Sequence, residues 1–182
     1  MKSQPVTAMR RVAVRAAMFA AAVLAGAPAR AVLFDSTGDP NFNTTAPTGA
    51  LAGSGWQYEG IFGGFLATPI APDYFIAAKH VGMSVGQTLV YSGNTYVTDA
   101  FVDSPNSDLR VWHVTTPFST YAPLYTGTNV IGSDFVVIGR GNERGADILL
   151  GGNLVGWAWN TTGANLERWG TNTVTSRVDL GA

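Results

Sequence analysis

From Trp56 onward, the chain consists of short runs rich in Val, Ile, Phe, Tyr and Trp, and turn-forming residues interrupt these runs at modest intervals. Such runs are typical of strands, and no amphipathic helical stretch of useful length accompanies them. The pattern predicts an all-β fold, arranged as a barrel or sandwich and not as a parallel α/β sheet. We expect strands at residues 60–68, 74–78, 88–91, 95–102, 109–115, 135–139, 152–160 and 172–178. Turns are expected at 71–73, 92–94, 104–106 and 140–142, where Pro, Gly, Asn, Asp or Ser cluster.

The first 31 residues differ from the remainder of the chain. Basic residues precede an apolar run over Ala16–Ala27, and Ala29-Arg30-Ala31 follows that run. This order is typical of a secretory signal peptide with an Ala-x-Ala cleavage site. We therefore expect cleavage after Ala31 and a secreted or periplasmic protein. The apolar run is shorter than the roughly 20 residues that span a bilayer, and no later segment is long and apolar enough, so we expect no membrane span.

Residues 32–55 are expected to form an irregular N-terminal arm. The stretch from Asp35 to Gly55 is rich in Gly, Pro, Asn, Thr and Ser, and it has no apolar period. Residues 56–182 are expected to form one domain, because the chain after the leader is long enough to bury a sizeable core.

Composition narrows the classes of functional site. The chain has no cysteine, which excludes thiol catalysis and thiolate metal sites and leaves burial alone to hold the fold. With two histidines and no His/Asp/Glu cluster at ligand spacing, we expect neither a metal nor another cofactor. Removal of the leader leaves six basic residues against twelve acidic ones, and such a balance does not favour a nucleic-acid partner.

The segment Ile70–Val81 carries the first candidate for chemistry. A turn opens an apolar strand that ends in small residues and places His80 where the strand leaves the core. Histidine is the side chain best suited to proton transfer near neutral pH. The segment resembles the histidine motif of secreted bacterial trypsin/chymotrypsin-like serine proteases, in which Thr/Ser-Ala-Ala-His follows an apolar strand. It departs from that motif at Ala77 and at Lys79. The resemblance implies that His80 is a general base.

Asp108 is the candidate partner of His80. Asp108 and the leucine after it resemble the Asp-Ile/Leu pair that begins a strand in the same family, although Arg110 replaces the usual Ala. The resemblance implies that Asp108 orients the imidazole and stabilises its protonated form. Asp99 and Asp103 compete for this role. Asp99 lies within an expected strand and Asp103 precedes a turn, so Asp108 is preferred.

The family's nucleophile lies in Gly-Asp-Ser-Gly-Gly, and this motif does not occur in the chain. The glycine-flanked Ser54 precedes His80 and lies in the arm, so it does not fit the role. Phe135–Gly141 resembles the strand that leads to the Gly-Trp-Gly corner of the family's second barrel, with Arg140 in place of Trp. The resemblance covers roughly residues 56–141. It implies a trypsin-like double β-barrel with a complete first barrel and a partial second one, in a chain truncated before the serine.

These patterns favour a secreted trypsin-like serine endopeptidase homologue. In the complete protein, a polypeptide substrate would be hydrolysed through an acyl-enzyme, whereas this chain lacks the nucleophile and is expected to be inactive alone. One alternative is a noncatalytic secreted β-barrel binding module, a pseudoprotease that uses a tryptophan-rich surface. Another is an unrelated β-sandwich, in which His80 and Asp108 would lie far apart. His113 lies in an expected strand and is interpreted as a packed or surface residue. The tryptophans of the proposed binding surface are Trp56, Trp157, Trp159 and Trp169.

Overall fold

The computed structural model describes residues 34, 36–160 and 165–178. The signal peptide expected over residues 1–31, with its cleavage after Ala31, lies outside these residues. The described part is mostly β, and its helical elements are three single turns of 3-10 helix, η1 (Gly49–Leu51), η2 (Trp56–Tyr58) and η3 (Lys79–Val81). Within the described residues, no helix has the length and apolar character needed to cross a membrane.

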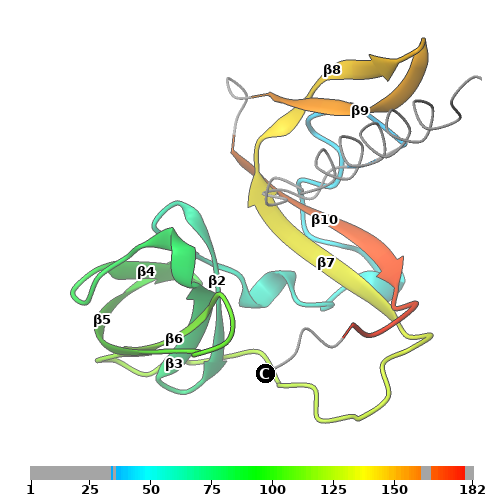
Figure 1. The fold of residues 1–182 in the computed structure, drawn as a ribbon. Helices are drawn as coiled ribbons and strands as arrows, with labels where there is room; N and C mark the ends of the chain where they lie inside the picture. The colour runs from blue at the N-terminus through cyan, green and yellow to red at the C-terminus, as the bar shows by residue number, and fades with distance from the viewer. Residues whose placement is uncertain (1–33, 35, 161–164, 179–182) are drawn as a thin grey trace, which may run out of the picture.

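Six antiparallel strands form a closed barrel in the spatial order β1-β2-β3-β6-β5-β4 (Figure 1). Their bounds are β1 Gly60–Phe62, β2 Phe65–Ala71, β3 Tyr74–Ala78, β4 Thr88–Tyr91, β5 Asn94–Asp103 and β6 Leu109–Val114. The barrel closes where β1 pairs with β4, and closure removes the unpaired edges that an open sheet would present. The all-β prediction is therefore confirmed, and the sheet that holds the core is a barrel.

The expected strand over residues 60–68 is wrong, because a tight turn divides it into β1 and β2. Gly63 and Gly64 have φ values of +62° and +84°, a region that residues with a side chain rarely adopt. A Cβ atom at Gly63 would also lie 2.5 Å from the sulfur of Met83. The backbone conformation at residue 63 therefore favours glycine, and a side chain there would also displace the flexible Met83 side chain.

Aromatic side chains fill the interior of the barrel. The Trp112 ring meets Phe62 edge-on at 5.0 Å and stacks on Phe75 at 6.2 Å between ring centroids. Phe118, which follows β6, packs against Tyr96 at 4.5 Å. The buried non-proline apolar side chains of the described residues all belong to the barrel and the segment that follows it. They are Phe62, Ala67, Phe75, Ala77, Leu89, Tyr91, Tyr96, Trp112, Val114 and Phe118.

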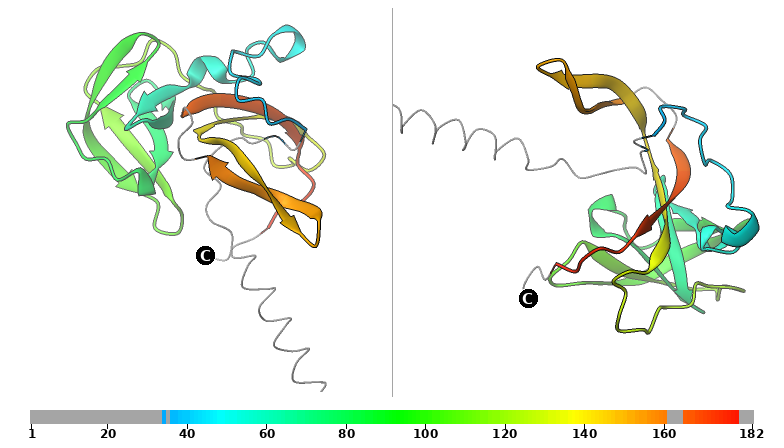
Figure 2. Two further views of the ribbon diagram at one scale, coloured as in Figure 1. Left: turned by 90° about the horizontal axis from the view of Figure 1, so that it is seen from above. Right: turned by 90° about the vertical axis from the view of Figure 1, so that its right-hand side faces the viewer.

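The strands after the barrel form two separate two-stranded sheets (Figures 1 and 2). β7 (Asp134–Gly141) pairs with β10 (Leu166–Thr173), and β8 (Glu143–Leu150) pairs with β9 (Asn153–Asn160), both in antiparallel fashion. The sequence did not predict β8, and the turn expected at 140–142 is absent because strand continues on both sides of Asn142. The last strand occupies 166–173 and not the expected 172–178.

The N-terminal arm lies along the outer edge of β10. The backbone N–H of Trp169 donates to the carbonyl of Asn43 at 3.2 Å, and the Asn43 side chain returns a bond to the Trp169 carbonyl at 2.9 Å. The guanidinium of Arg168, a buried side chain, donates from two nitrogens to the carbonyl of Pro40 at 3.2 and 2.7 Å. The arm thus satisfies part of an edge that would otherwise be open to another strand.

Phe75→Ala tests the aromatic core. Phe75 is 0% exposed, so its truncation removes buried contacts and leaves a cavity. We expect the free energy of unfolding to fall by about 3–5 kcal/mol in urea denaturation. Leu150→Ala is the control, because Leu150 is 73% exposed and its loss is expected to change stability by less than about 0.5 kcal/mol. Similar losses for the two variants would contradict a core confined to the barrel.

Candidate functional site

His80 lies in η3, immediately after β3 leaves the barrel. Ala77, on β3, is buried in the core, and its small side chain lets the strand end pack closely. Gly82 closes the turn: its φ is +73°, and its N–H donates to the carbonyl of Lys79 at 3.1 Å. The sequence therefore places the imidazole on a short, well-defined turn at the end of a buried strand.

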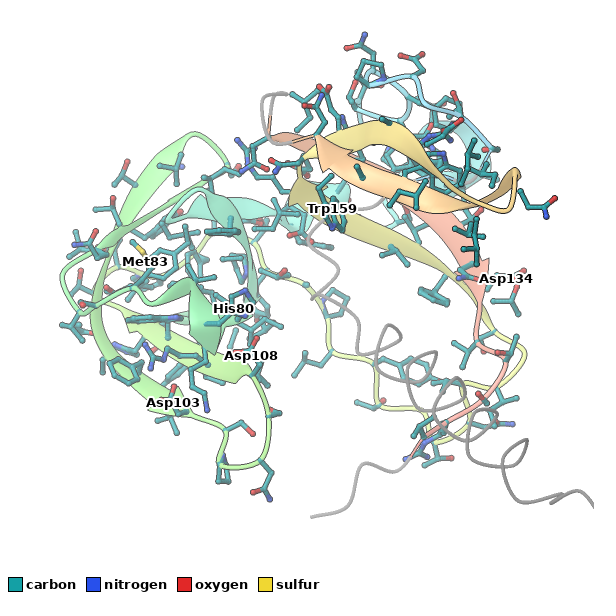
Figure 3. All side chains as sticks on the ribbon, turned by 45° about the horizontal axis from the view of Figure 1, so that its top comes forward. His80, Met83, Asp103, Asp108, Asp134 and Trp159 are labelled. Carbon is teal, nitrogen blue, oxygen red and sulfur yellow. The ribbon has the colours of Figure 1, made fainter. Side chains whose placement is uncertain are left out.

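Asp108 immediately precedes β6, and the pairing of β3 with β6 brings it beside His80. Ala78 lies opposite Leu109 in this pairing, and the Lys79 N–H donates to the Asp108 carbonyl at 2.9 Å. The Asp108 carboxylate holds His80 at two points. Its Oδ1 accepts the His80 backbone N–H at 2.9 Å, and its Oδ2 bonds to His80 Nδ1 (Figure 3).

In the His80–Asp108 pair, one ring nitrogen of the histidine faces the carboxylate and the other is left free by the described residues. The hydrogen bond from the His80 ring, followed by the bond from its backbone N–H, lowers the pKa of Asp108. An ionised carboxylate only accepts hydrogen bonds, so Nδ1 carries the proton that faces Asp108. Within the described part of the chain, His80 Nε2 has no hydrogen-bond partner, and the two side chains are 56% and 53% exposed. Nε2 is thus accessible and can accept a proton from an incoming group.

The two competing aspartates are engaged elsewhere. Asp103 binds the guanidinium of Arg110, with Nε–Oδ1 and Nη2–Oδ2 distances of 2.5 and 2.9 Å. Asp99 bonds to Nδ1 of His113 at 2.5 Å. Of the three carboxylates considered from the sequence, Asp108 is the one that the structure brings to His80.

Ser54 does not join the pair. It lies between η1 and η2, and it lines a pocket with residues of β7 and β10. Among the described residues, no hydroxyl group makes a hydrogen bond to His80. The structure therefore brings together the two residues selected from the sequence, and within its described residues it adds no nucleophile to them.

His113 forms a second histidine–aspartate cluster on the outside of the barrel. Its Nδ1 bonds to Asp99, which follows Thr98 at an irregularity in the pairing of β5 with β6, and its Nε2 lies 3.3 Å from Asp73. The hydrogen bond to Asp99 is the largest cause that raises the pKa of His113, and Asp73 adds to it. Because both ring nitrogens face carboxylates, the cluster favours an imidazolium and leaves no nitrogen to act as a base.

Neither a scan against protein-family models nor a search of the curated proteins finds a match for this chain. In the part of the chain that the structure describes, no three His, Asp or Glu side chains gather in a way that could hold a metal ion.

Glu59 is a perturbed group that the sequence did not reveal. It lies between η2 and β1, where burial raises its pKa to about 7, a hydrogen bond from Thr68 opposes the rise, and Glu167 of β10 adds to it. Burial also raises the pKa of Glu167, while Arg140 lowers it. No pattern around Glu59 signals this, because burial depends on the fold and Glu167 is distant from Glu59 in the sequence.

His113→Gln tests the second cluster through the pH dependence of stability. The pKa of His113 is higher in the folded protein than its ordinary 6.5, so its stabilisation is complete below pH 6.5 and is lost as pH rises through the folded pKa. Urea denaturation should show a larger deficit for the variant at pH 6 than at pH 9. Asp99→Asn should behave in the same way, and equal deficits at both pH values would contradict this reading.

Glu59→Gln tests the buried carboxyl group. Because folding raises this pKa from 4.5 to about 7, the contribution of Glu59 to stability is greatest below pH 4.5 and is lost as pH rises through 7. The neutral amide avoids the loss, so the variant should be more stable than wild type at pH 8.5 by on the order of 2 kcal/mol and similar to it at pH 4.5. Glu143→Gln, on β8, is the control and should show no such gain. A wild-type advantage at pH 8.5 would exclude the buried carboxylate.

Proposed function

We propose that this protein is a secreted trypsin-like serine endopeptidase homologue, in which His80 is the general base and Asp108 is its orienting carboxylate. The observation that carries the proposal is the double contact of Asp108 with the ring Nδ1 and the backbone N–H of His80. A triad requires an acid that fixes the tautomer of the histidine and leaves Nε2 directed at the nucleophile. The exposed His80 side chain leaves Nε2 open to such a nucleophile, which supports the proposal.

The proposed reaction is hydrolysis of a polypeptide through an acyl-enzyme. As a serine oxygen attacks the peptide carbonyl, its proton passes to His80 Nε2, and Asp108 stabilises the imidazolium. The proton then passes to the departing amine as the C–N bond breaks, and water releases the acyl group by the same sequence of transfers. This chain contains no Gly-Asp-Ser-Gly-Gly segment, so it is inactive alone, and the complete reaction requires a protein that also carries the serine.

The proposal includes a trypsin-like double barrel. The closed barrel of β1–β6 corresponds to a complete first barrel, with the histidine after β3 and the aspartate before β6. The strands from β7 to β10 correspond to a partial second barrel. Two observations support a partial second barrel. These four strands pair in antiparallel fashion, as barrel strands do, and they contribute none of the buried apolar side chains among the described residues, as expected of a barrel whose core is incomplete.

The departure from the family motif at Lys79 is compatible with this proposal. The ammonium group donates to the carbonyl of Ser104 at 3.4 Å, on the loop between β5 and β6. Its charge contributes to the lowering of the Asp108 pKa, after the larger effects of the hydrogen bonds from His80. Lys79 thus helps to keep the carboxylate ionised, as an orienting acid must be.

Sequencing of the genomic locus beyond the codon for Ala182, followed by expression of the whole open frame, tests the proposal. We expect a Gly-Asp-Ser-Gly-Gly motif or a close variant, and a product that a fluorophosphonate labels. With a peptide substrate, Asp108→Asn should lower kcat by about 10⁴, and His80→Ala should lower it by about 10⁶.

The second histidine–aspartate cluster supplies the matched controls. His113→Gln and Asp99→Asn remove the same chemical groups outside the proposed site, and kcat should stay within about twofold of wild type. Comparable losses in both clusters would contradict the assignment of His80 and Asp108. A confirmed stop with no serine motif would exclude the enzyme and leave the noncatalytic module.

One observation favours the noncatalytic binding module, although it differs from the expected tryptophan platform. Of the four tryptophans considered for that surface, Trp159 is exposed, whereas the other three are partly buried. A group of exposed aliphatic side chains lies instead on the β8–β9 hairpin. It comprises Ile148, Leu149, Leu150, Leu154 and Val155. A binding module would use this hairpin.

A further inference from the structure

The His80–Asp108 pair is held in place without burial. Both side chains are more than half exposed, so neighbouring atoms do not restrict them as a core would. The geometry of the pair must therefore come from the backbone that carries each residue. At the start of η3, the bond from the Lys79 N–H to the Asp108 carbonyl joins the two segments at 2.9 Å. This bond holds only the start of the segment from Lys79 to Met83, here called the His80 segment, so a second attachment is needed to fix its end.

Arg110 supplies that attachment. Two of its nitrogens bind the carboxylate of Asp103, at the end of β5, and its third, Nη1, donates to the carbonyl of Met83 at 3.2 Å. Met83 lies three residues after His80 (Figure 3). One planar group on β6 thus joins the end of β5 to the segment that leaves η3.

The guanidinium is itself fixed. Its central carbon lies 3.8 Å from the centroid of the Phe101 ring and 5.1 Å from that of Trp112. The Arg110 side chain is 12% exposed, so water screens its contacts less than those of a free surface ion pair. A planar fork with several donors can hold a carboxylate and a carbonyl at once, whereas the point charge of lysine cannot reproduce that geometry.

We propose that Arg110 is a positioning residue that fixes the His80 segment against β6, the strand that begins immediately after Asp108. Its importance for catalysis rests on the proposed function, whereas the attachment itself does not. Arg110 stands where the family resemblance predicts Ala, so the attachment is a property of this chain and not of the motif. It replaces the rigidity that burial would otherwise give to the pair.

The experiment compares wild type with Arg110→Met, which keeps an apolar stem, and Arg110→Lys, which keeps the charge. NMR follows the exchange of the His80 amide, whose N–H donates to Asp108, relative to the Phe75 amide in the barrel. In both variants we expect this relative exchange to be about tenfold faster. We also expect the pKa of Asp108, followed through its carboxyl carbon, to rise toward its ordinary value as the bonds from His80 loosen.

Arg168→Met is the matched control. Arg168 also donates to backbone carbonyls, but it lies on β10 and attaches the arm, so the His80 amide should exchange as in wild type. Scaling to the Phe75 amide removes any general loss of stability. Should Arg110→Met fail to fold, Arg110→Lys decides the question.

His80 exchange and Asp108 titration that stay within twofold of wild type in a folded Arg110 variant would overturn the proposal. All of these measurements use the present chain and require no hydrolysis. A positive result would therefore stand even if the complete open frame proved inactive, and a negative one would leave the roles of His80 and Asp108 intact.

Discussion

The antiparallel pairing of β3 with β6 is the interaction on which both the core and the candidate site depend. In its middle, the register sets Phe75 opposite Trp112, so two of the largest core side chains meet inside the barrel. At its end, the same register sets Ala78 opposite Leu109 and brings the turn with His80 to the carboxylate of Asp108. A slip of one residue would turn the core side chains outward and separate the pair. Folding stability and site geometry are therefore specified by the same backbone bonds.

The barrel was more predictable from the sequence than the sheets beyond it, and burial explains the difference. β3 and β4 have the expected bounds, because their alternating buried side chains leave a clear apolar pattern. β8 begins with Glu143–Asp147, which contains no β-branched or aromatic residue, and it buries little. A strand that contributes little to a core can form without the alternating apolar residues by which strands are recognised in a sequence.

Local motifs identified the candidate pair, whereas tertiary contacts determined its surroundings. His80 and Asp108 each stand at the end of a strand that the sequence reveals, so their meeting follows once these strands pair. The hydrogen bond from Arg110 to the Met83 carbonyl could not be predicted from the sequence, because any residue at position 83 would supply the same backbone acceptor. The choice among the aspartates likewise depends on strand register, since Asp99 and Asp103 are drawn to other partners.

The attachment of the arm to β10 has a consequence for the order of folding. Asn43 and Trp169 are separated by 126 residues, although they share two hydrogen bonds. A chain synthesised from its N-terminus completes the barrel strands well before β10 emerges, and contacts between distant residues form late. The arm therefore cannot form its hydrogen bonds to β10 until after the barrel has folded, and it docks once β10 is in place. Assembly of this chain would then proceed in two steps, with the first residues to appear among the last to find their places.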